Sequence, residues 1–73
     1  MKYYLKTPFG IFFISSAPYG GYNLNLEEDT INWSNSAEEL AQQVFERTSG
    51  FEEWDKATNL EAPKNLEEWQ VKI

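Results

Sequence analysis

Alternation of apolar and polar side chains is the main signal along this chain, because successive residues of a strand point to opposite faces of a sheet. Residues 2–7 place Tyr3 and Leu5 on one face and polar or amphipathic side chains on the other. Residues 22–26 alternate completely, with three apolar side chains on one face and two asparagines on the other. Both patterns predict a half-buried strand.

Three further segments predict strands. Residues 11–15 begin with four consecutive apolar side chains, which is typical of a strand covered on both faces, so we expect it at the centre of the sheet. Residues 30–33 follow an acidic turn and predict a short return strand with Ile31 and Trp33 on one face. Residues 69–73 alternate again and predict a terminal strand. The inward side chains of that last strand would be Trp69, Val71 and Ile73.

A helical period replaces the alternation after residue 35. Ser36 and Glu39 have the spacing of a capping box, in which each side chain accepts a hydrogen bond from the other residue's backbone N–H. Apolar side chains then recur at i, i+3, i+4, i+7 and i+8, which predicts one buried stripe. The members of this stripe are Ala37, Leu40, Ala41, Val44 and Phe45. Arg47 would lie in the last turn, where a cation suits the helix dipole, and Gly50 would end the helix.

The remaining segments complete a small α+β fold. Residues 51–57 predict a further helical turn, because Phe51 and Trp54 are three residues apart, and residues 59–65 predict a loop. We therefore expect a small antiparallel sheet of four to five strands with one principal α-helix packed on one face. The expected order is β-β-β-(β)-α-β, and residues 1–73 would form a single small globular domain.

Aromatic side chains make up 16% of the chain, and cysteine and histidine are absent. Neither a disulfide nor a Cys/His zinc site can stabilise the fold, so side-chain burial must supply the core. A small core gains much of its area from tryptophan. We therefore expect at least two of Trp33, Trp54 and Trp69 to be largely buried, and Trp54 to be partly exposed because its segment is short and acidic.

The same composition disfavours catalysis. Histidine and cysteine supply the commonest general bases and nucleophiles, and glycosidase chemistry would need two carboxylates flanking a cleft. A chain of 73 residues is too short to build such a cleft easily, so we expect that this protein is not an enzyme. The contiguous acids at residues 27–29 lack the alternating spacing and the glycine of a calcium loop. We expect no metal site and no cofactor.

A net charge of −6 disfavours nucleic acid and suits a protein partner with a basic surface. The carboxylates gather around the predicted helix start and in the segment after it, together with one tryptophan. The candidate partner-binding residues are Glu38, Glu39, Glu52, Glu53, Trp54 and Asp55. Tyr19 is a further candidate, because tyrosine in a glycine-rich loop gives contact area at low entropic cost.

Several interpretations of function stay open. The leading one is a small non-catalytic protein–protein interaction or inhibitory module that uses an acidic face; a merely solvated acidic surface is the simpler alternative. A single-stranded nucleic-acid binder could use the aromatic side chains of Tyr3, Phe12 and Phe13, although lysine and arginine are scarce. A self-associating protein could pair residues 69–73 across a two-fold axis as a homodimer.

The chain also lacks the sequence signals of membrane insertion and export. No stretch approaches the roughly 20 apolar residues that span a bilayer. The apolar run at residues 10–14 is shorter than the core of a signal peptide. We therefore expect a cytoplasmic protein.

Overall fold

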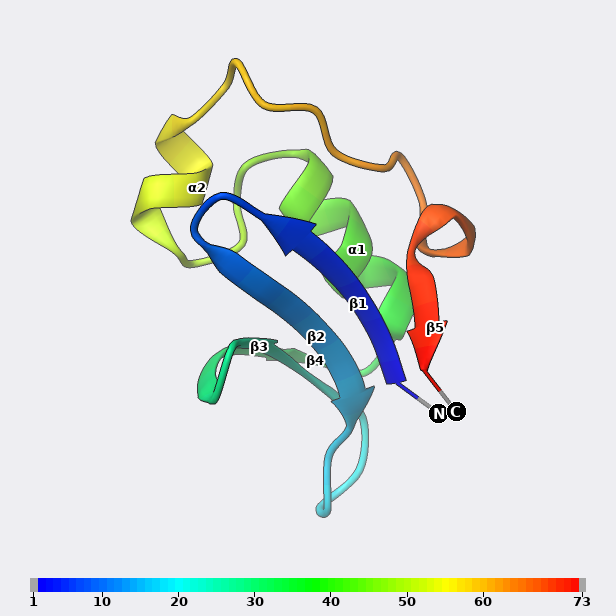
Figure 1. Ribbon diagram of the computed structural model, residues 1–73. Coiled ribbons are helices and arrows are strands. Elements are labelled where there is room, and N and C mark those ends of the chain that lie inside the picture. The colour runs from blue at the N-terminus through cyan, green and yellow to red at the C-terminus, as the bar shows by residue number, and fades with distance from the viewer. Residues whose placement is uncertain (1, 73) are drawn as a thin grey trace.

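The computed structural model describes residues 2–72, which form an antiparallel sheet with a helical layer on one face (Figure 1). The strands are β1 (Lys2–Thr7), β2 (Gly10–Ser16), β3 (Tyr22–Leu26), β4 (Asp29–Ser34) and β5 (Gln70–Lys72). The helices are α1 (Ala37–Phe45), α2 (Glu52–Lys56) and the 3-10 turn η1 (Leu66–Glu68). The strand order is β4-β3-β2-β1-β5, and all neighbours are antiparallel. The predicted α+β class is confirmed.

The central strand is β2, as its apolar run predicts. Phe12 and Ile14 are completely buried on the side of α1, whereas Ile11 and Phe13 alternate to the opposite face and are half-buried. The described residues place no helix on that opposite face, so the expected covering of both faces is wrong. The sheet therefore keeps one open face with apolar side chains on it.

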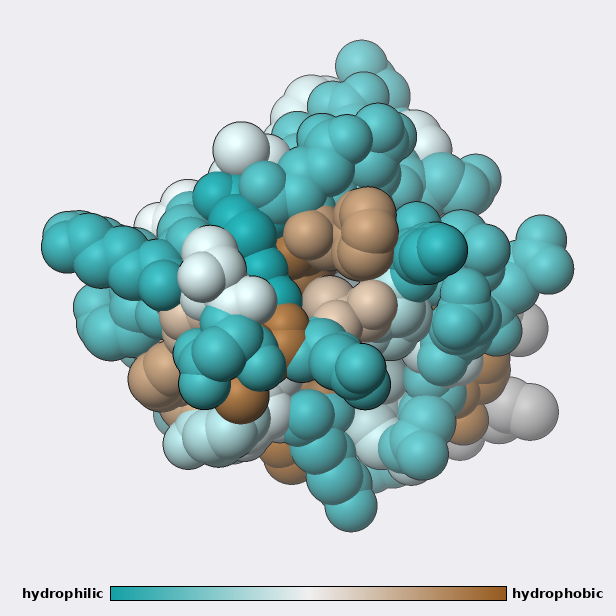
Figure 2. All heavy atoms as spheres, turned by 90° about the horizontal axis from the view of Figure 1, so that it is seen from above, coloured by the Kyte–Doolittle hydropathy of each residue, from teal (hydrophilic) through white to brown (hydrophobic). Residues whose placement is uncertain are grey.

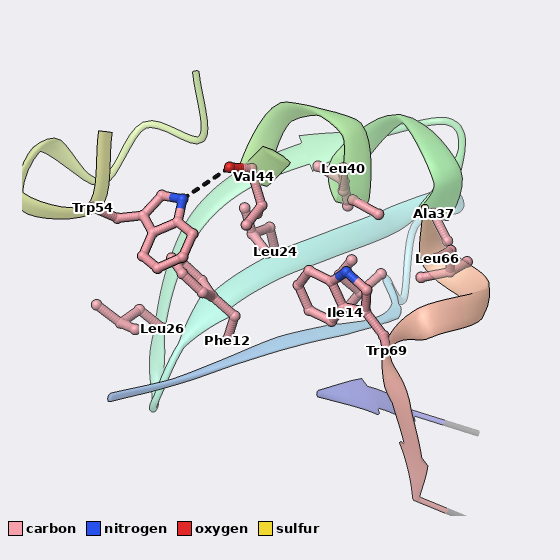
Figure 3. Packing of buried hydrophobic residues seen from close by; sticks show 11 residues of the cluster. Phe12, Ile14, Leu24, Leu26, Ala37, Leu40, Val44, Trp54, Leu66 and Trp69 are labelled. Carbon is pink, nitrogen blue, oxygen red and sulfur yellow. Dashed lines mark hydrogen bonds between the residues drawn. The ribbon is translucent and has the colours of Figure 1, made fainter. Parts of the chain in front are cut away.

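The core lies between α1 and the sheet (Figure 3). Ala37, Leu40, Ala41 and Val44 are buried against the strands, which confirms four of the five positions of the predicted stripe. Phe45, the fifth, is 40% exposed. At 100° per residue it lies about 80° from the middle of the stripe, so it falls at the margin of the buried side.

The end of α1 differs from the prediction. The helix stops at Phe45, and Arg47 adopts a left-handed conformation with φ of 65°. The Arg47 N–H donates to the Val44 carbonyl at 3.3 Å and the Thr48 N–H to the Gln43 carbonyl at 2.9 Å. These two bonds form a Schellman motif, in which Arg47 occupies the position that glycine usually fills. Arg47 therefore ends the helix instead of lying in its last turn, and Gly50 is not the terminator.

One irregularity separates two side chains that were expected together. The β3–β4 register shifts between Leu24 and Asn25, so β4 contains one additional residue at this point. Ile31 packs against the core, whereas Trp33 pairs with Asn23 on the open face. The prediction that Ile31 and Trp33 share one face is wrong, because one inserted residue reverses the alternation of the strand.

The C-terminal segment adds η1, which alternation does not predict, before β5. Trp69 is 3% exposed and Val71 is 46% exposed, because β5 is short and lies at the edge of the sheet. Val71 pairs with Tyr3 on the helix side of the sheet, as expected, but it stays exposed at the edge, and Ile73 lies outside the described residues. Among residues 2–72, no helix has both the length and the hydrophobicity needed to cross a bilayer.

Candidate interaction surfaces

Charge is separated between the two layers of the molecule. Residues 36–69, which include all the helices, carry nine of the twelve acidic residues and three of the six basic ones, a net charge of −6. The strands and their turns carry three of each and are neutral. We call the exposed carboxylates of residues 36–69 the acidic helical layer. Its members are Glu38, Glu39, Glu46, Glu52, Glu53, Glu61, Glu67 and Glu68.

Glu38 and Glu39 lie in the first turn of α1, where carboxylates suit the helix dipole. The Ser36 hydroxyl accepts a hydrogen bond from the Glu39 N–H at 3.4 Å, as the capping box predicts. The Ser36 N–H instead donates to the Ser34 hydroxyl at 3.3 Å, and the Glu39 carboxylate accepts from the Gln43 amide at 3.5 Å. Only half of the capping box forms, and both glutamates stay at the surface.

Glu52 and Glu53 begin α2 and are also exposed. Glu52 forms an ion pair with Lys56 at 2.5 Å, four residues along the helix. An exposed pair of this kind is worth only about 0–1 kcal/mol, so a partner can compete for it. Figure 2 shows the end of the molecule formed by α2 and the residues after it, where hydrophilic side chains surround small apolar patches.

Trp54 is not the exposed tryptophan that the sequence suggested; it is 1% exposed. Its indole N–H donates to the Val44 carbonyl at 2.9 Å, at the end of α1 (Figure 3). Its ring lies edge-on to Phe12, with centroids 5.5 Å apart, and under the Arg47 guanidinium at 4.2 Å. The carbonyls at a helix end need donors, and this one receives the indole, so Trp54 attaches α2 to the core.

Asp55 is committed to the backbone of the preceding loop. One carboxylate oxygen accepts from the Ser49 N–H at 3.0 Å and from the Ser49 hydroxyl at 2.8 Å. The other oxygen accepts from the Gly50 N–H at 3.2 Å. Trp54 and Asp55 make their contacts inside the molecule. Of the candidate partner-binding residues in the helical layer, only the four glutamates are therefore exposed.

The four glutamates do not form one cluster. Trp54 attaches α2 to the C-terminal end of α1, whereas Glu38 and Glu39 lie at its N-terminal end, and nine helical residues span about 13 Å. The η1 turn packs against α1, and Leu66 lies beside Ala37 (Figure 3), which brings the Glu67 and Glu68 segment to the N-terminal end. The acidic helical layer therefore has two ends.

The opposite surface is the open sheet face, defined by register and alternation. Its positions are Lys2, Tyr4, Lys6, Ile11, Phe13, Ser15, Asn23, Asn25, Thr30, Trp33, Gln70 and Lys72. Three of these are lysines and none is acidic. The three aromatic side chains that were predicted to bind single-stranded nucleic acid do not share one surface. Phe12 is buried on the helix side of the sheet and Tyr3 lies on that same side, so only Phe13 lies on the open face.

Tyr19 lies in the β2–β3 loop, at the end of the molecule away from α2 (Figure 1). It is 72% exposed, and its ring stacks on Trp33 with centroids 6.3 Å apart. The Trp33 indole donates to the Gly20 carbonyl at 2.9 Å, and the Tyr19 hydroxyl to Asn23 at 3.1 Å. A Cβ on Gly21 would lie 2.5 Å from the Trp33 ring, so glycine is required there. Trp33, which is 40% exposed, was not predicted because the β-bulge that turns it outward leaves no mark in the sequence.

No protein-family model, curated protein or solved structure matches this chain. Within residues 2–72, no group of acidic side chains converges closely enough to hold a metal ion. The described surfaces present exposed carboxylates on the helical layer, and aromatic rings with ammonium groups on the open sheet face.

Proposed function

We propose that this protein is a small non-catalytic interaction module whose acidic helical layer binds a basic protein surface. The observation that carries the proposal is the separation of charge, since residues 36–69 hold the entire net charge of −6. A surface of one sign steers an oppositely charged partner and fixes its orientation. The proposal keeps the cytoplasmic location expected from the sequence.

The structure narrows the candidate partner-binding residues to the four exposed glutamates. Glu38 and Glu39 at one end of α1, and Glu52 and Glu53 beyond the other, are exposed and can meet a partner directly. Trp54 and Asp55 support this surface from inside, because they hold α2 against α1 and the preceding loop. Tyr19 belongs to the other layer and has no part in this contact.

The test is affinity capture of the tagged protein at low and at high salt, with mass spectrometry of the bound proteins. We expect a basic protein that is lost at high salt, because screening shortens the reach of exposed charges. Two double variants, Glu38→Lys with Glu39→Lys and Glu52→Lys with Glu53→Lys, should each weaken its capture at low salt.

The matched control is Glu28→Lys with Asp29→Lys, which changes the net charge equally where β4 begins. This control should retain the partner. Equal capture by all three double variants would show that the position of the carboxylates is irrelevant, and the proposal would fail.

A further inference from the structure

The open sheet face contains an apolar hollow with a basic rim. The hollow has a volume of about 320 Å³ and is lined by the open-face residues Tyr4, Ile11, Phe13 and Lys72, and by Val71 of the edge strand. The Tyr4 and Phe13 rings are 6.5 Å apart, and the Lys2 ammonium lies 5.0 Å from the centre of the Phe13 ring. The hollow can receive one large apolar side chain that is flanked by negative charge.

Two lysines at the rim oppose each other across neighbouring strands. Lys2 on β1 pairs with Lys72 on β5, and like charges directly opposite in a sheet are destabilising. Within residues 2–72, neither ammonium forms an ion pair with a carboxylate. A partner that brings carboxylates to this rim would relieve the repulsion.

The outer side of α1 carries a matching arrangement. Glu38, Gln42, Phe45 and Glu46 are all exposed and recur at i, i+4, i+7 and i+8, so they share one stripe of the helix. The Gln42 amide donates to the Glu46 carboxylate at 3.0 Å. We call these four residues the outer stripe of α1. It presents one large apolar side chain between carboxylates.

We propose that the outer stripe of α1 in one copy of this chain docks on the open sheet face of a second copy. Phe45 enters the hollow, Glu46 faces Lys2 and Lys72, and Glu38 faces Lys6. The inference rests on the proposed function, because the acidic helical layer supplies the carboxylates, and it names the lysine-bearing open face of a second copy as the basic surface.

The spacing of charges on the two surfaces agrees. Glu38 and Glu46 are eight helical residues apart, about 12 Å, and Lys2 and Lys6 are four strand residues apart, about 13 Å. The contact would also cover the open face with a helix, as α1 covers the other face, so the sheet would lie between two helical layers. Because the two surfaces differ, the interface is heterologous, and successive copies can add to it.

The experiment is analytical ultracentrifugation of purified variants, alone and mixed. Phe45→Lys removes the apolar group from the stripe and introduces a cation near the C-terminal end of the helix, which suits the helix dipole. Lys2→Glu with Lys72→Glu reverses the rim but preserves a like-charge pair, so the sheet keeps the same internal repulsion. Each variant alone should associate about tenfold or more weakly than the native chain.

The mixture is the decisive measurement. Each variant retains the surface that the other lacks, so an equimolar mixture should form a dimer of one copy of each and nothing larger. The matched control, Lys56→Glu with Lys64→Glu, changes the net charge as much outside the sheet and should associate like the native chain.

Three results would overturn the inference: a native chain that stays monomeric at high concentration, variants that associate normally, or a mixture that remains monomeric. Quenching of the exposed Trp33 by oligothymidylate, with a monomeric native chain, would assign the open face to nucleic acid instead. A monomeric chain that still captures a basic protein through its glutamates would end this inference and leave the proposed function intact. A chain that neither self-associates nor captures a basic protein would end both this inference and the proposed function.

Discussion

At the scale of single residues, the two buried tryptophans have opposite hydrogen-bonding states. The Trp54 indole donates to the Val44 carbonyl, whereas the Trp69 indole nitrogen is buried and has no partner among the described residues. An unpaired buried donor costs about 1–3 kcal/mol, and a satisfied one contributes about 1 kcal/mol. Two side chains of equal size therefore make different contributions to stability.

We predict that Trp54→Phe lowers the free energy of unfolding by about 1–3 kcal/mol, because it removes a satisfied hydrogen bond and the surface on which Arg47 stacks. Trp69→Phe should change it by less than about 1 kcal/mol, because loss of the unpaired donor offsets the lost volume. Urea unfolding of both variants provides the measurement. A larger loss for Trp69→Phe than for Trp54→Phe would contradict the prediction.

At the scale of elements, the ends of the helices depend on residues whose roles differ from those their types suggest. Arg47 ends α1 in a left-handed conformation while its guanidinium contacts the Trp54 ring and donates to the Leu60 carbonyl. A non-glycine residue in this conformation costs roughly 1–2 kcal/mol. The side-chain contacts of Arg47 offset that strain.

Comparison of Arg47→Gly with Arg47→Ala measures the strain directly, since both variants lose the guanidinium contacts. The glycine variant should be the more stable of the two by about 1 kcal/mol, because glycine adopts positive φ without a Cβ penalty. Chemical denaturation of the pair is the measurement. Equal stabilities would mean that this position bears no backbone strain.

The junction between α1 and α2 depends on Asp55. Asp55→Asn should lower the free energy of unfolding by about 1–3 kcal/mol, because an amide has one acceptor oxygen where the carboxylate uses two. Glu53→Gln, the exposed control on the same helix, should stay within about 0.5 kcal/mol of the native chain. Thermal or urea unfolding distinguishes them. A neutral Asp55→Asn would instead indicate that the carboxylate has a role outside the fold.

At the scale of the whole molecule, the acidic helical layer is both the proposed binding surface and an electrostatic cost to the fold. Carboxylates of one sign repel one another across residues 36–69, where few cations compensate. The sheet, with its strands and turns, is neutral overall, and its open face carries lysines. The same separation of charge therefore favours contact between molecules and opposes compactness within one.

The stability should consequently rise with ionic strength. Between about 10 mM and 150 mM salt the screening length falls from roughly 30 Å to 8 Å, which weakens repulsion among exposed carboxylates. We expect the free energy of unfolding to increase by a few tenths of a kcal/mol to about 1 kcal/mol. Urea unfolding at dilute protein concentration in both buffers is the measurement. A decrease would show that attractive pairs such as Glu52–Lys56 outweigh the repulsion.

The sequence by itself determined the local elements of this protein. Strand alternation at residues 2–7 and 22–26, the apolar run of the central strand, and the helical stripe after Ser36 all depend on the positions of near neighbours along the chain. The α+β class follows from those elements. The exposure of the four glutamates was likewise foreseeable, because carboxylates are rarely buried without partners.

Only the tertiary structure decided which of these side chains face solvent. Trp54 is buried because the carbonyl end of α1 lies beside it, and Trp33 is exposed because one inserted residue in β4 reverses the alternation. Asp55 is engaged by a loop six residues earlier that folds back onto it. Each of these outcomes depends on contacts between segments that no local pattern relates, so burial and hydrogen bonding, and with them the candidate surfaces, were fixed when the layers packed together.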